Sequence, residues 1–352
     1  MATIKDVARR AGVSVGTVSN VMSGAAAVKE SMRARVEQAI KDLDFHPNHA
    51  ARSLKSRRTH TLGMVISDIT NPFFPLLVRG AEDAALKRGY LLNIFNTDDH
   101  VEREQSIFAV LRARCADGVL AVVAPSVGPP AHLQETMGAG IPLVCLDRIP
   151  PELSVDSVVI DNVRGSVICI RHLIAMGHRR ISIVSGSARL QTARDRLSGY
   201  CQGLSEAGIP FDPALVREGD FRVESGYRLA KELCLSNPRP TALFIANGTM
   251  GMGAVRAVQE IGLRCPDDVA VVVFDDVPGS DLFRPRLTVV SQPAYQIGFQ
   301  GAELLIQRIM GEIASKTPVS IVLQGELKIR ESTNGARPRA GTAEYAGVVR
   351  SQ

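Results

Sequence analysis

The stretch MATIKDVARRAGVSVGTVSNVM, residues 1–22, decides how the N-terminal end of this chain folds. It predicts two short helices joined by a tight turn. Thr3 is a suitable N-cap, and Asp6 at the third helical position can reach back to open backbone N–H groups. Gly12 ends the first helix because glycine enters the left-handed conformation freely, and Ser14 caps the second. The pattern is typical of a helix-turn-helix, whose second helix is shaped to enter the DNA major groove.

Apolar residues at helical spacing predict the core of this unit. They are Ile4, Val7, Ala8 and Ala11 in the first helix and Val18 and Val21 in the second. The second helix then exposes Val15, Gly16, Thr17, Ser19 and Asn20. A third helix is expected from about Glu30 to Leu43, with a weak start because Lys29 stands where Ser or Asp would cap.

The basic charge of the chain is concentrated at the same end. Residues 1–60 hold 11 of the 41 Lys and Arg residues and 5 of the 36 Asp and Glu residues, a net charge of +6. The remaining 292 of the 352 residues hold 30 basic and 31 acidic residues, a net charge of −1. A basic head on a near-neutral body predicts polyanion binding by the head, through phosphate neutralisation and counterion release. A solvated basic face is the alternative from charge alone.

Composition bounds the class of protein. With 352 residues and 45% hydrophobic content, the chain is long enough for two or three domains. It shows no long apolar run and no leader before the first helix, so we expect a cytoplasmic, nucleoid-associated protein with no membrane partner. The six cysteines lack CxxC spacing, which indicates reduced core thiols. The histidines show no metal-ligand spacing either, so neither a metal nor a cofactor is expected.

A basic segment links the head to the rest of the chain. We assign residues 1–46 to the head and residues 47–59 to a hinge, which is too short and too basic to fold alone and is expected to become helical on DNA. Leu54 is its only large apolar residue, set among cations, and such a leucine can wedge between base pairs from the minor groove. A flexible tether whose leucine packs on the body is the alternative.

From Thr61 onward, near-continuous apolar strands alternate with helices in two successive series. This alternation predicts an α/β body of parallel sheets covered on both faces by helices. Two series predict two lobes, with a ligand site in the cleft between them, at the carboxyl ends of the strands. The expected divisions are an N-terminal lobe at about 60–161 and 292–318, a C-terminal lobe at about 162–290 and 319–333, and a mobile tail at 334–352.

Six motifs stand in one order along the chain. They are TIKDVARRAGVSVGTVS at the head, ARSLKS in the hinge, NPFF after the first body strand, Asp161-Asn162, RDRLSGY in the second half and a closing RES. In these motifs the chain resembles the LacI/GalR (lac-repressor) family of bacterial transcription regulators, from Ala2 to about Thr333. The resemblance implies a helix-turn-helix headpiece with a hinge helix, followed by a two-lobed, periplasmic-binding-protein-like body.

The resemblance also implies the activity and the partners. Members of the family are repressors that bind a near-palindromic operator as a homodimer, and a tetramer remains open for this chain. A small-molecule effector in the interlobe cleft controls them, so no catalytic residue is expected. Closure of the cleft would shift the N-terminal lobes of the dimer and change the spacing of the hinges. Whether the effector releases or promotes DNA binding depends on which state of the cleft it favours.

Carried over by position, the family pattern predicts the DNA contacts. Val15, Gly16 and Asn20 would face base edges, Ser14, Thr17 and Ser19 would contact phosphates, and Thr3, Arg52, Leu54 and Lys55 complete the set. Asn20 can bond to an adenine edge and Val15 can touch a thymine methyl, but Gly16 offers no side chain. Direct readout is therefore expected to be sparse, with more weight on Asn20, Leu54 and DNA deformability. Alternatively, Gly16 marks a close approach of the backbone to DNA.

Residues at strand ends are the candidates for the effector site. Asp275 ends the strand DVAVVVFD and can accept hydrogen bonds from vicinal hydroxyls, or else cap a turn. Arg196 can donate a fork of bonds to an oxygen-rich ligand, or form an interdomain salt bridge. The set is completed by Asn71, Phe73, Phe74, Asp147, Phe221 and Asn247. For any one phenylalanine a core role is the default, although a ring can stack on a sugar or a base.

Two departures from the family pattern bear on the ligand. Asn247 is followed by Gly248, where members often have an aspartate. Leu190 stands where purine-binding relatives carry a base-reading arginine. Both changes weaken the transfer of any particular ligand from the family. A neutral sugar or sugar derivative remains the first expectation for the effector, and a purine-like corepressor the second.

Two other classes of protein were weighed against a regulator. A plain solute-binding protein would share the two lobes but would carry no basic head. An enzyme would need a phosphate loop or a catalytic constellation. GTMGMG, residues 248–253, reads GxxGxG with no following Lys-Ser/Thr, and no nucleophile elbow is present.

Overall fold

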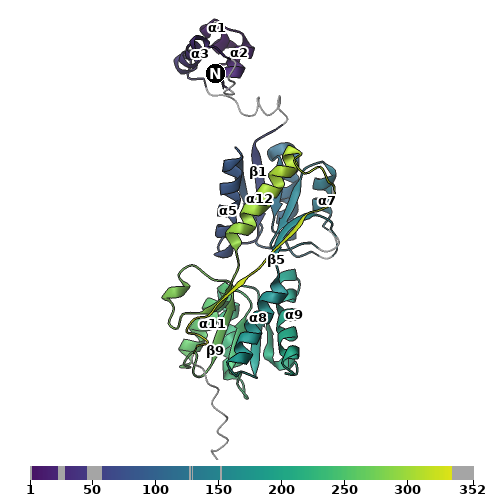
Figure 1. The fold of residues 1–352 in the computed structure, drawn as a ribbon, viewed down its shortest axis with the longest axis vertical. Helices are drawn as coiled ribbons and strands as arrows, with labels where there is room; N and C mark the ends of the chain where they lie inside the picture. Colours follow the sequence, from purple (N-terminus) through teal and green to yellow (C-terminus); the bar gives the residue numbers. More distant parts are fainter. Residues whose placement is uncertain are drawn as a thin grey trace, which may run out of the picture. The chain divides into compact units, whose positions relative to one another are not determined.

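The computed structural model describes residues 2–22, 28–45, 58–126, 128, 130–150 and 153–334 (Figure 1). The chain divides into two compact units, Met1–Thr59 and His60–Gln352. Residues 46–57 and 335–352 lie outside the described ranges. The predicted DNA contacts Arg52, Leu54 and Lys55, most of the hinge and all but the first residue of the tail therefore lie there too.

In its described residues, the first unit contains three helices, α1 (Ile4–Ala11), α2 (Val15–Met22) and α3 (Glu30–Asp42). The predicted capping of α1 is confirmed. The Asp6 N–H donates to Thr3 Oγ1 at 3.4 Å, and the Thr3 N–H donates to Asp6 Oδ2 at 3.0 Å. Gly12 ends the helix with φ 64°. Lys29 gives α3 no side-chain cap, as expected.

The core of this unit follows the predicted spacing. Val7, Val18 and Val36, one from each helix, are fully buried. Ala8, Ala11, Val21, Ala39 and Phe45 complete the buried cluster. Phe45 was not predicted from the sequence, because it follows α3 and shares no helical repeat with it.

The N-terminal lobe of the second unit is a six-stranded parallel sheet in the order β11-β5-β4-β3-β1-β2. Its strands are β1 (Thr61–Ile66), β2 (Leu91–Asn96), β3 (Gly118–Ala121), β4 (Leu143–Leu146), β5 (Asp156–Ile160) and β11 (Ser320–Leu323). Its helices are α5 (Phe73–Lys87), α6 (Val101–Val110), the π-helical turn η1 (Leu111–Cys115), α7 (Ala131–Gly138) and α12 (Ala294–Met310). Helices α5 and α12 pack against each other along one face of the sheet (Figure 1).

The C-terminal lobe is a second six-stranded sheet in the order β12-β10-β9-β8-β6-β7, parallel except for β12. Its strands are β6 (Ile181–Ser185), β7 (Val216–Glu218), β8 (Ala242–Ile245), β9 (Ala270–Phe274), β10 (Thr288–Ser291) and β12 (Glu326–Lys328). Its helices are α8 (Asn162–Ala175), α9 (Gln191–Glu206), α10 (Val223–Leu235) and α11 (Gly248–Glu260), with short 3₁₀ turns η2 (Pro213–Leu215) and η3 (Ser280–Leu282). The central strands are fully buried, as strands covered on both faces must be.

The chain passes between the lobes after β5, after β10 and after β11. The first two passages agree with the lobe boundaries predicted from the sequence, but the third does not. We expected the C-terminal lobe to resume at residue 319, whereas Ser320 pairs with Ser157 and Leu323 with Ile160 in the N-terminal sheet. Only β12 joins the other sheet, beside β10. One apolar run thus supplies a strand to each lobe, a division that periodicity alone does not reveal.

Gly253, in the glycine-rich stretch 248–253, and Gly226 allow two helices to pack closely. A Cβ on Gly253 would lie 2.0 Å from the Val223 carbonyl oxygen on α10, and a Cβ on Gly226 would lie 2.2 Å from the Met250 carbonyl oxygen on α11. Without side chains at these positions, α10 and α11 approach backbone to backbone. None of the helices in the described ranges is long and apolar enough to cross a membrane.

Candidate DNA interface and effector cavity

The side chains of α2 divide into a buried and an exposed set, as the sequence predicts. Val15 is 41% exposed, and Ser14, Gly16 and Asn20 are exposed as well, while Thr17 and Ser19 are half-buried. Ser14 Oγ accepts the Thr17 N–H at 3.0 Å, which caps the helix. A Cβ on Gly16 would meet nothing closer than Ser14 Oγ at 3.6 Å, so the packing of the unit does not require glycine there.

Thr3 has a local partner. Its hydroxyl lies 2.6 Å from Asp6 Oδ2 and also receives the Asp6 N–H. These bonds lower the pKa of Asp6 below its usual value. Thr3 therefore holds the start of α1, and any contact of this residue with DNA has to coexist with the cap.

In the second unit, one cavity of about 280 Å³ lies where the two sheets present the carboxyl ends of their strands. All eight predicted effector residues line it: Asn71, Phe73, Phe74 and Asp147 from the N-terminal lobe, and Arg196, Phe221, Asn247 and Asp275 from the C-terminal lobe. The strand-end argument used for the sequence thus locates this cavity.

The backbone around the cavity is strained. Of the seven non-glycine residues with positive φ in the described ranges, five line this cavity: Asp98 (52°), Asp99 (60°), Asp147 (67°), Phe221 (64°) and Asp275 (81°). A left-handed backbone is costly for residues with a side chain, most of all for a bulky one such as Phe221. Strain of this kind persists where the surrounding fold imposes it, and it clusters at binding sites.

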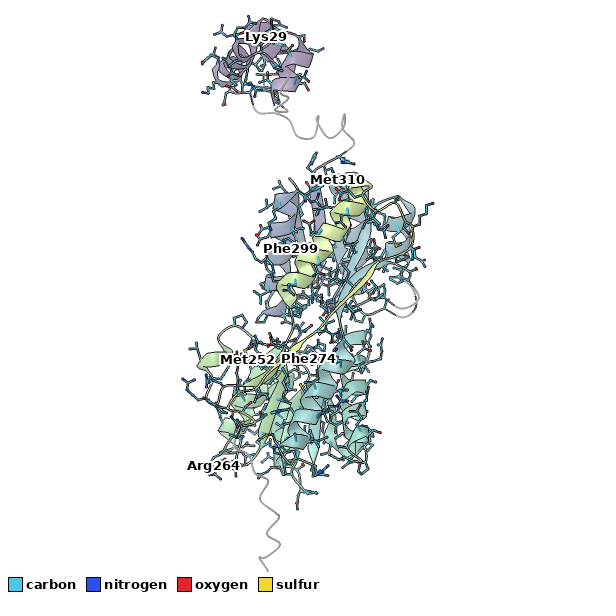
Figure 2. The ribbon with its side chains drawn as sticks, in the orientation of Figure 1. Lys29, Met252, Arg264, Phe274, Phe299 and Met310 are labelled. Atoms are coloured by element: carbon cyan, nitrogen blue, oxygen red, sulfur yellow. The ribbon has the colours of Figure 1, made fainter. Side chains whose placement is uncertain are left out.

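Arg196 is held in place from several sides. Its Nε donates to Asn162 Oδ1 at 2.9 Å and its Nη1 to the Ala246 carbonyl at 2.6 Å. Its guanidinium lies 3.9 Å from the Phe274 ring centroid, and Figure 2 labels Phe274 at the end of the lobe that faces the N-terminal lobe. Nη1 is also 3.9 Å from Asp275 Oδ2. All these partners belong to the C-terminal lobe, so Arg196 does not form the interdomain salt bridge considered as an alternative.

Asp275 is paired with a residue from the passage between the lobes. Gln292, which follows β10, donates through Nε2 to Asp275 Oδ1. Gln292 Oε1 is buried and accepts no hydrogen bond within the described part of the chain. A carboxylate and an open amide oxygen at one point of the cavity suit a ligand that donates hydrogen bonds.

On the opposite lobe, Asp147 and Arg148 follow β4. Burial raises the pKa of Asp147, although the charges of Arg148 and Arg196 act in the opposite direction. Arg148 Nη2 donates to Asp99 Oδ1 at 3.0 Å and to Ser67 Oγ. Arg148 Nε lies 3.8 Å from Asp147 Oδ2, too far for a hydrogen bond. Arg148 thus ties three strand ends of the lobe together.

Asn247 and Asn71 hold the wall of the cavity through their own amides. Asn247 Oδ1 accepts the Met250 N–H at 2.9 Å, which caps α11, and its Nδ2 donates to the Phe221 carbonyl at 3.2 Å. Asn71 Oδ1 accepts the Phe73 N–H at 3.2 Å. Both polar atoms of the Asn247 amide therefore bond within the protein. A ligand can be contacted only through the second Nδ2 hydrogen and the second lone pair of Oδ1.

Packing explains why glycine follows Asn247 at position 248. A Cβ on Gly248 would lie 2.5 Å from Val277 Cγ1 and 3.3 Å from the Cβ of Asp275. An aspartate at this position does not fit unless Val277 moves. Leu190 is buried and presents an apolar surface to the same cavity.

Sequence reasoning missed several residues of the cavity. They are mainly Ser67, Asp68, Asp98, Asp99, Arg148, Arg189, Thr192, Asp220, Arg222 and Gln292. The aspartates among them directly follow β1, β2 and β7, so a stricter use of the strand-end rule would have found them. Arg148 follows β4 and is found by the same rule, but its bonds to Asp99 and Ser67 depend on the neighbouring strands.

Comparisons with known proteins match both units. Residues 3–48 match the family model "Bacterial regulatory proteins, lacI family", and residues 170–333 match a periplasmic binding protein-like domain. The HTH-type transcriptional repressor PurR of Proteus mirabilis is 35% identical over 89% of this chain and 92% of the relative. The repressor PurR of Histophilus somni is 34% identical over 94% of this chain and 99% of the relative.

Solved structures of transcriptional regulators are also similar to this chain over almost its whole length. The transcriptional regulator CelR–cellobiose complex is 34% identical with a TM-score of 0.72, over 94% of this chain and all of that chain. The lac repressor dimer bound to operator and the anti-inducer ONPF is 28% identical with a TM-score of 0.83, over 94% of this chain and 99% of that one.

A helix-turn-helix unit joined to a two-lobed body with a polar cavity defines a DNA-binding regulator that responds to a small ligand. The relatives are transcriptional repressors, so the protein is not an enzyme. The chain belongs to the lacI family of bacterial regulatory proteins.

Proposed function

We propose that this regulator is a repressor that binds a near-palindromic operator as a homodimer and is controlled by a sugar or sugar derivative in the interlobe cavity. Asn20 and Leu54 supply most of the sequence specificity, with Val15 adding a methyl contact. The phosphates are met by Ser14, Thr17, Ser19 and the cations of the hinge.

The acidity of the cavity is the observation that carries the choice of a sugar. Six aspartates line it, against four arginines, together with three phenylalanine rings. Carboxylates accept hydrogen bonds from vicinal hydroxyls and repel anionic ligands, while an aromatic ring packs on the apolar face of a sugar. Leu190 stands where purine-binding relatives carry an arginine that contacts the base, so this cavity lacks that contact. The transcriptional regulator CelR, which was solved as a complex with cellobiose, is similar over 94% of this chain.

A purine-like corepressor is the second candidate. The observation in its favour is the group of phenylalanines, since Phe73, Phe74 and Phe221 can stack on a planar base. Relatives at 33–35% identity carry the name PurR, so the ligand screen below includes purines.

The proposed dimer surface lies on α5 and β2 of the N-terminal lobe. Leu76 and Leu86 on α5 and Leu91 and Ile94 on β2 are large apolar residues that are about half exposed or more. β2 is also the edge of its sheet. An exposed apolar edge strand is usually protected by a partner, and a second copy of the chain supplies one.

Regulation follows from linkage between the two units. Closure of the lobes around the effector shifts the N-terminal lobes of the dimer and changes the spacing of the hinges. Coupling of this kind typically amounts to ~1–3 kcal/mol, which gives a several-fold to hundredfold change in operator affinity.

The test is a ligand screen followed by DNA binding. Full-length protein is screened by thermal shift against a panel of mono- and disaccharides and a panel of purine bases and nucleosides. Each hit is then added to a fluorescence-anisotropy titration of an operator that the same protein has selected from random duplexes. We expect a sugar to stabilise the protein and to change operator affinity. A response confined to purines would favour the second candidate, and hits that leave operator affinity unchanged would contradict effector control.

A further inference from the structure

Two hydrogen bonds join the lobes beside the effector cavity. The Ile149 N–H, in the N-terminal lobe, donates to Gln191 Oε1 at 3.0 Å. Arg189 Nη2 donates to the carbonyl of Pro125 at 3.3 Å. Both bonds run from side chains that precede or begin α9 to backbone groups that follow β4 and β3. The side chains that take part in these two bonds are those of Arg189 and Gln191.

Gln191 lies outside the effector cavity although its neighbour Leu190 lines it. Neither Gln191 nor Ile149 is among the residues that form the cavity wall. Together with Arg148 and Arg189, which also line the effector cavity, they surround an adjoining cavity of about 50 Å³. Gln191 thus contacts the opposite lobe without occupying a position where an effector would bind.

The local structure orients the Gln191 amide. Burial raises the pKa of Asp195, one turn further along α9, whereas the neighbouring Gln191 amide lowers it. Gln191 Oε1 accepts the Ile149 N–H from the opposite lobe. Arg194 supports the segment before the helix, because its Nη1 donates to the carbonyls of Ala188 at 2.8 Å and Arg189 at 3.0 Å.

We propose that Gln191 is a latch that sets the balance between the open and closed states of the body from outside the effector cavity. Arg189, which lines that cavity, supplies the second bond between the lobes. When the lobes open, the Ile149 N–H and the Pro125 carbonyl form hydrogen bonds with water instead. Each bond between the lobes therefore contributes only a modest net free energy to the closed state. Loss of one such bond changes an equilibrium by roughly threefold to tenfold. A contact of this strength biases the two states without locking either.

The consequence for regulation rests on the proposed function. Where the effector binds the closed body, a smaller closed population lowers its apparent affinity by the same factor. Residue 191 then tunes the concentration at which the regulator responds, while the cavity residues choose the ligand.

The test uses the full-length protein in three variants. Gln191→Ala removes the acceptor, Gln191→Glu keeps an oxygen that can accept the Ile149 N–H, and Gln202→Ala is the control. Gln202 is exposed on the same helix, and its Nε2 donates to Glu206 Oε1 at 3.0 Å. Thermal melting first establishes that each variant is folded.

Hydrogen exchange gives the readout, because it needs no ligand. We expect peptides that contain the Ile149 amide to exchange roughly threefold to tenfold faster in Gln191→Ala, and at the wild-type rate in Gln191→Glu and Gln202→Ala. An unchanged rate in Gln191→Ala would overturn the latch.

Operator titration without effector then tests the coupling separately. We expect Gln191→Ala to change operator affinity by the same factor as the exchange rate, with Gln202→Ala unchanged. Faster exchange with unaltered operator affinity would retain the latch as a contact between lobes and refute both its regulatory role and the proposed linkage.

Discussion

The guanidinium of Arg196 lies over the ring of Phe274, with 3.9 Å between its central carbon and the ring centroid. The Phe274 ring packs against one face of the guanidinium, and hydrogen bonds to Asn162 and Ala246 hold its edge. This arrangement presents the remaining N–H groups to the cavity with little freedom, which reduces the entropy that binding would cost.

Arg196→Lys should abolish most of the effector response. A lysine keeps the charge but loses the planar fork that bonds Asn162 and Ala246. We expect effector affinity to fall by about 2 kcal/mol, roughly 30-fold. The measurement is thermal shift and anisotropy with the best sugar of the screen. Arg171→Lys, at an exposed position of the same lobe where the guanidinium bonds Glu206, is the matched control, and equal losses in both variants would argue against a specific role for Arg196.

Gly253→Ala should destabilise the C-terminal lobe. The new methyl would meet the backbone of α10 at 2.0 Å, so the two helices have to separate. We expect a loss of about 2–3 kcal/mol in the free energy of unfolding, measured by urea denaturation. Gly138→Ala is the control, since nothing lies within 4 Å of its Cβ, and there we expect a gain of about 0.5–1 kcal/mol. A neutral result at residue 253 would refute the packing role of this glycine.

The C-terminal lobe should lose stability as the pH falls below about 6.5. Burial lowers the pKa of both His172 and His178 in the folded chain, and His172 also acts on His178. The unfolded chain therefore takes up protons first, so stability decreases between pH 7 and pH 5.

Melting temperature as a function of pH checks this expectation. The double replacement His172→Gln with His178→Gln should flatten the profile in that interval, even if the variant is less stable at pH 8. His100→Gln, at an exposed position in the other lobe, should keep the wild-type slope. A profile that the double variant leaves unchanged would assign the pH dependence to other groups.

Ile94→Glu should convert the dimer to a monomer. Placing a carboxylate on the exposed edge strand puts like charges together across a two-fold interface. We expect a halved mass in light scattering and a large loss of operator affinity, because each half-site would be bound alone. Leu235→Glu, at a still more exposed position on the C-terminal lobe, is the control. A dimer that persists in Ile94→Glu would move the interface elsewhere.

Leu54→Ala should weaken specific DNA binding far more than non-specific binding. The prediction comes from the sequence, since a leucine among cations suits a wedge between base pairs. Anisotropy titrations on the selected operator and on a scrambled duplex give the two affinities. An equal loss on both duplexes would show that Leu54 contributes no specificity.

Local patterns in the sequence determined a large part of this protein. Thr3 with Asp6, Gly12 and Ser14 fixed the ends of the first two helices, because caps and left-handed turns depend on a few neighbouring residues. The strand-end rule brought Asp147 and Asp275 to one cavity, because parallel strands end at the same edge of a sheet.

Other features were decided only by the tertiary structure. The division of one apolar run between β11 and β12, the commitment of Asn247 to a helix cap, and the contact of Val277 that explains Gly248 all involve residues far apart in the chain. The latch at Gln191 is of the same kind, since its partner is a backbone N–H of the other lobe. Caps and periodicity are local and can be read from spacing, whereas long-range packing exists only once the sheets have formed.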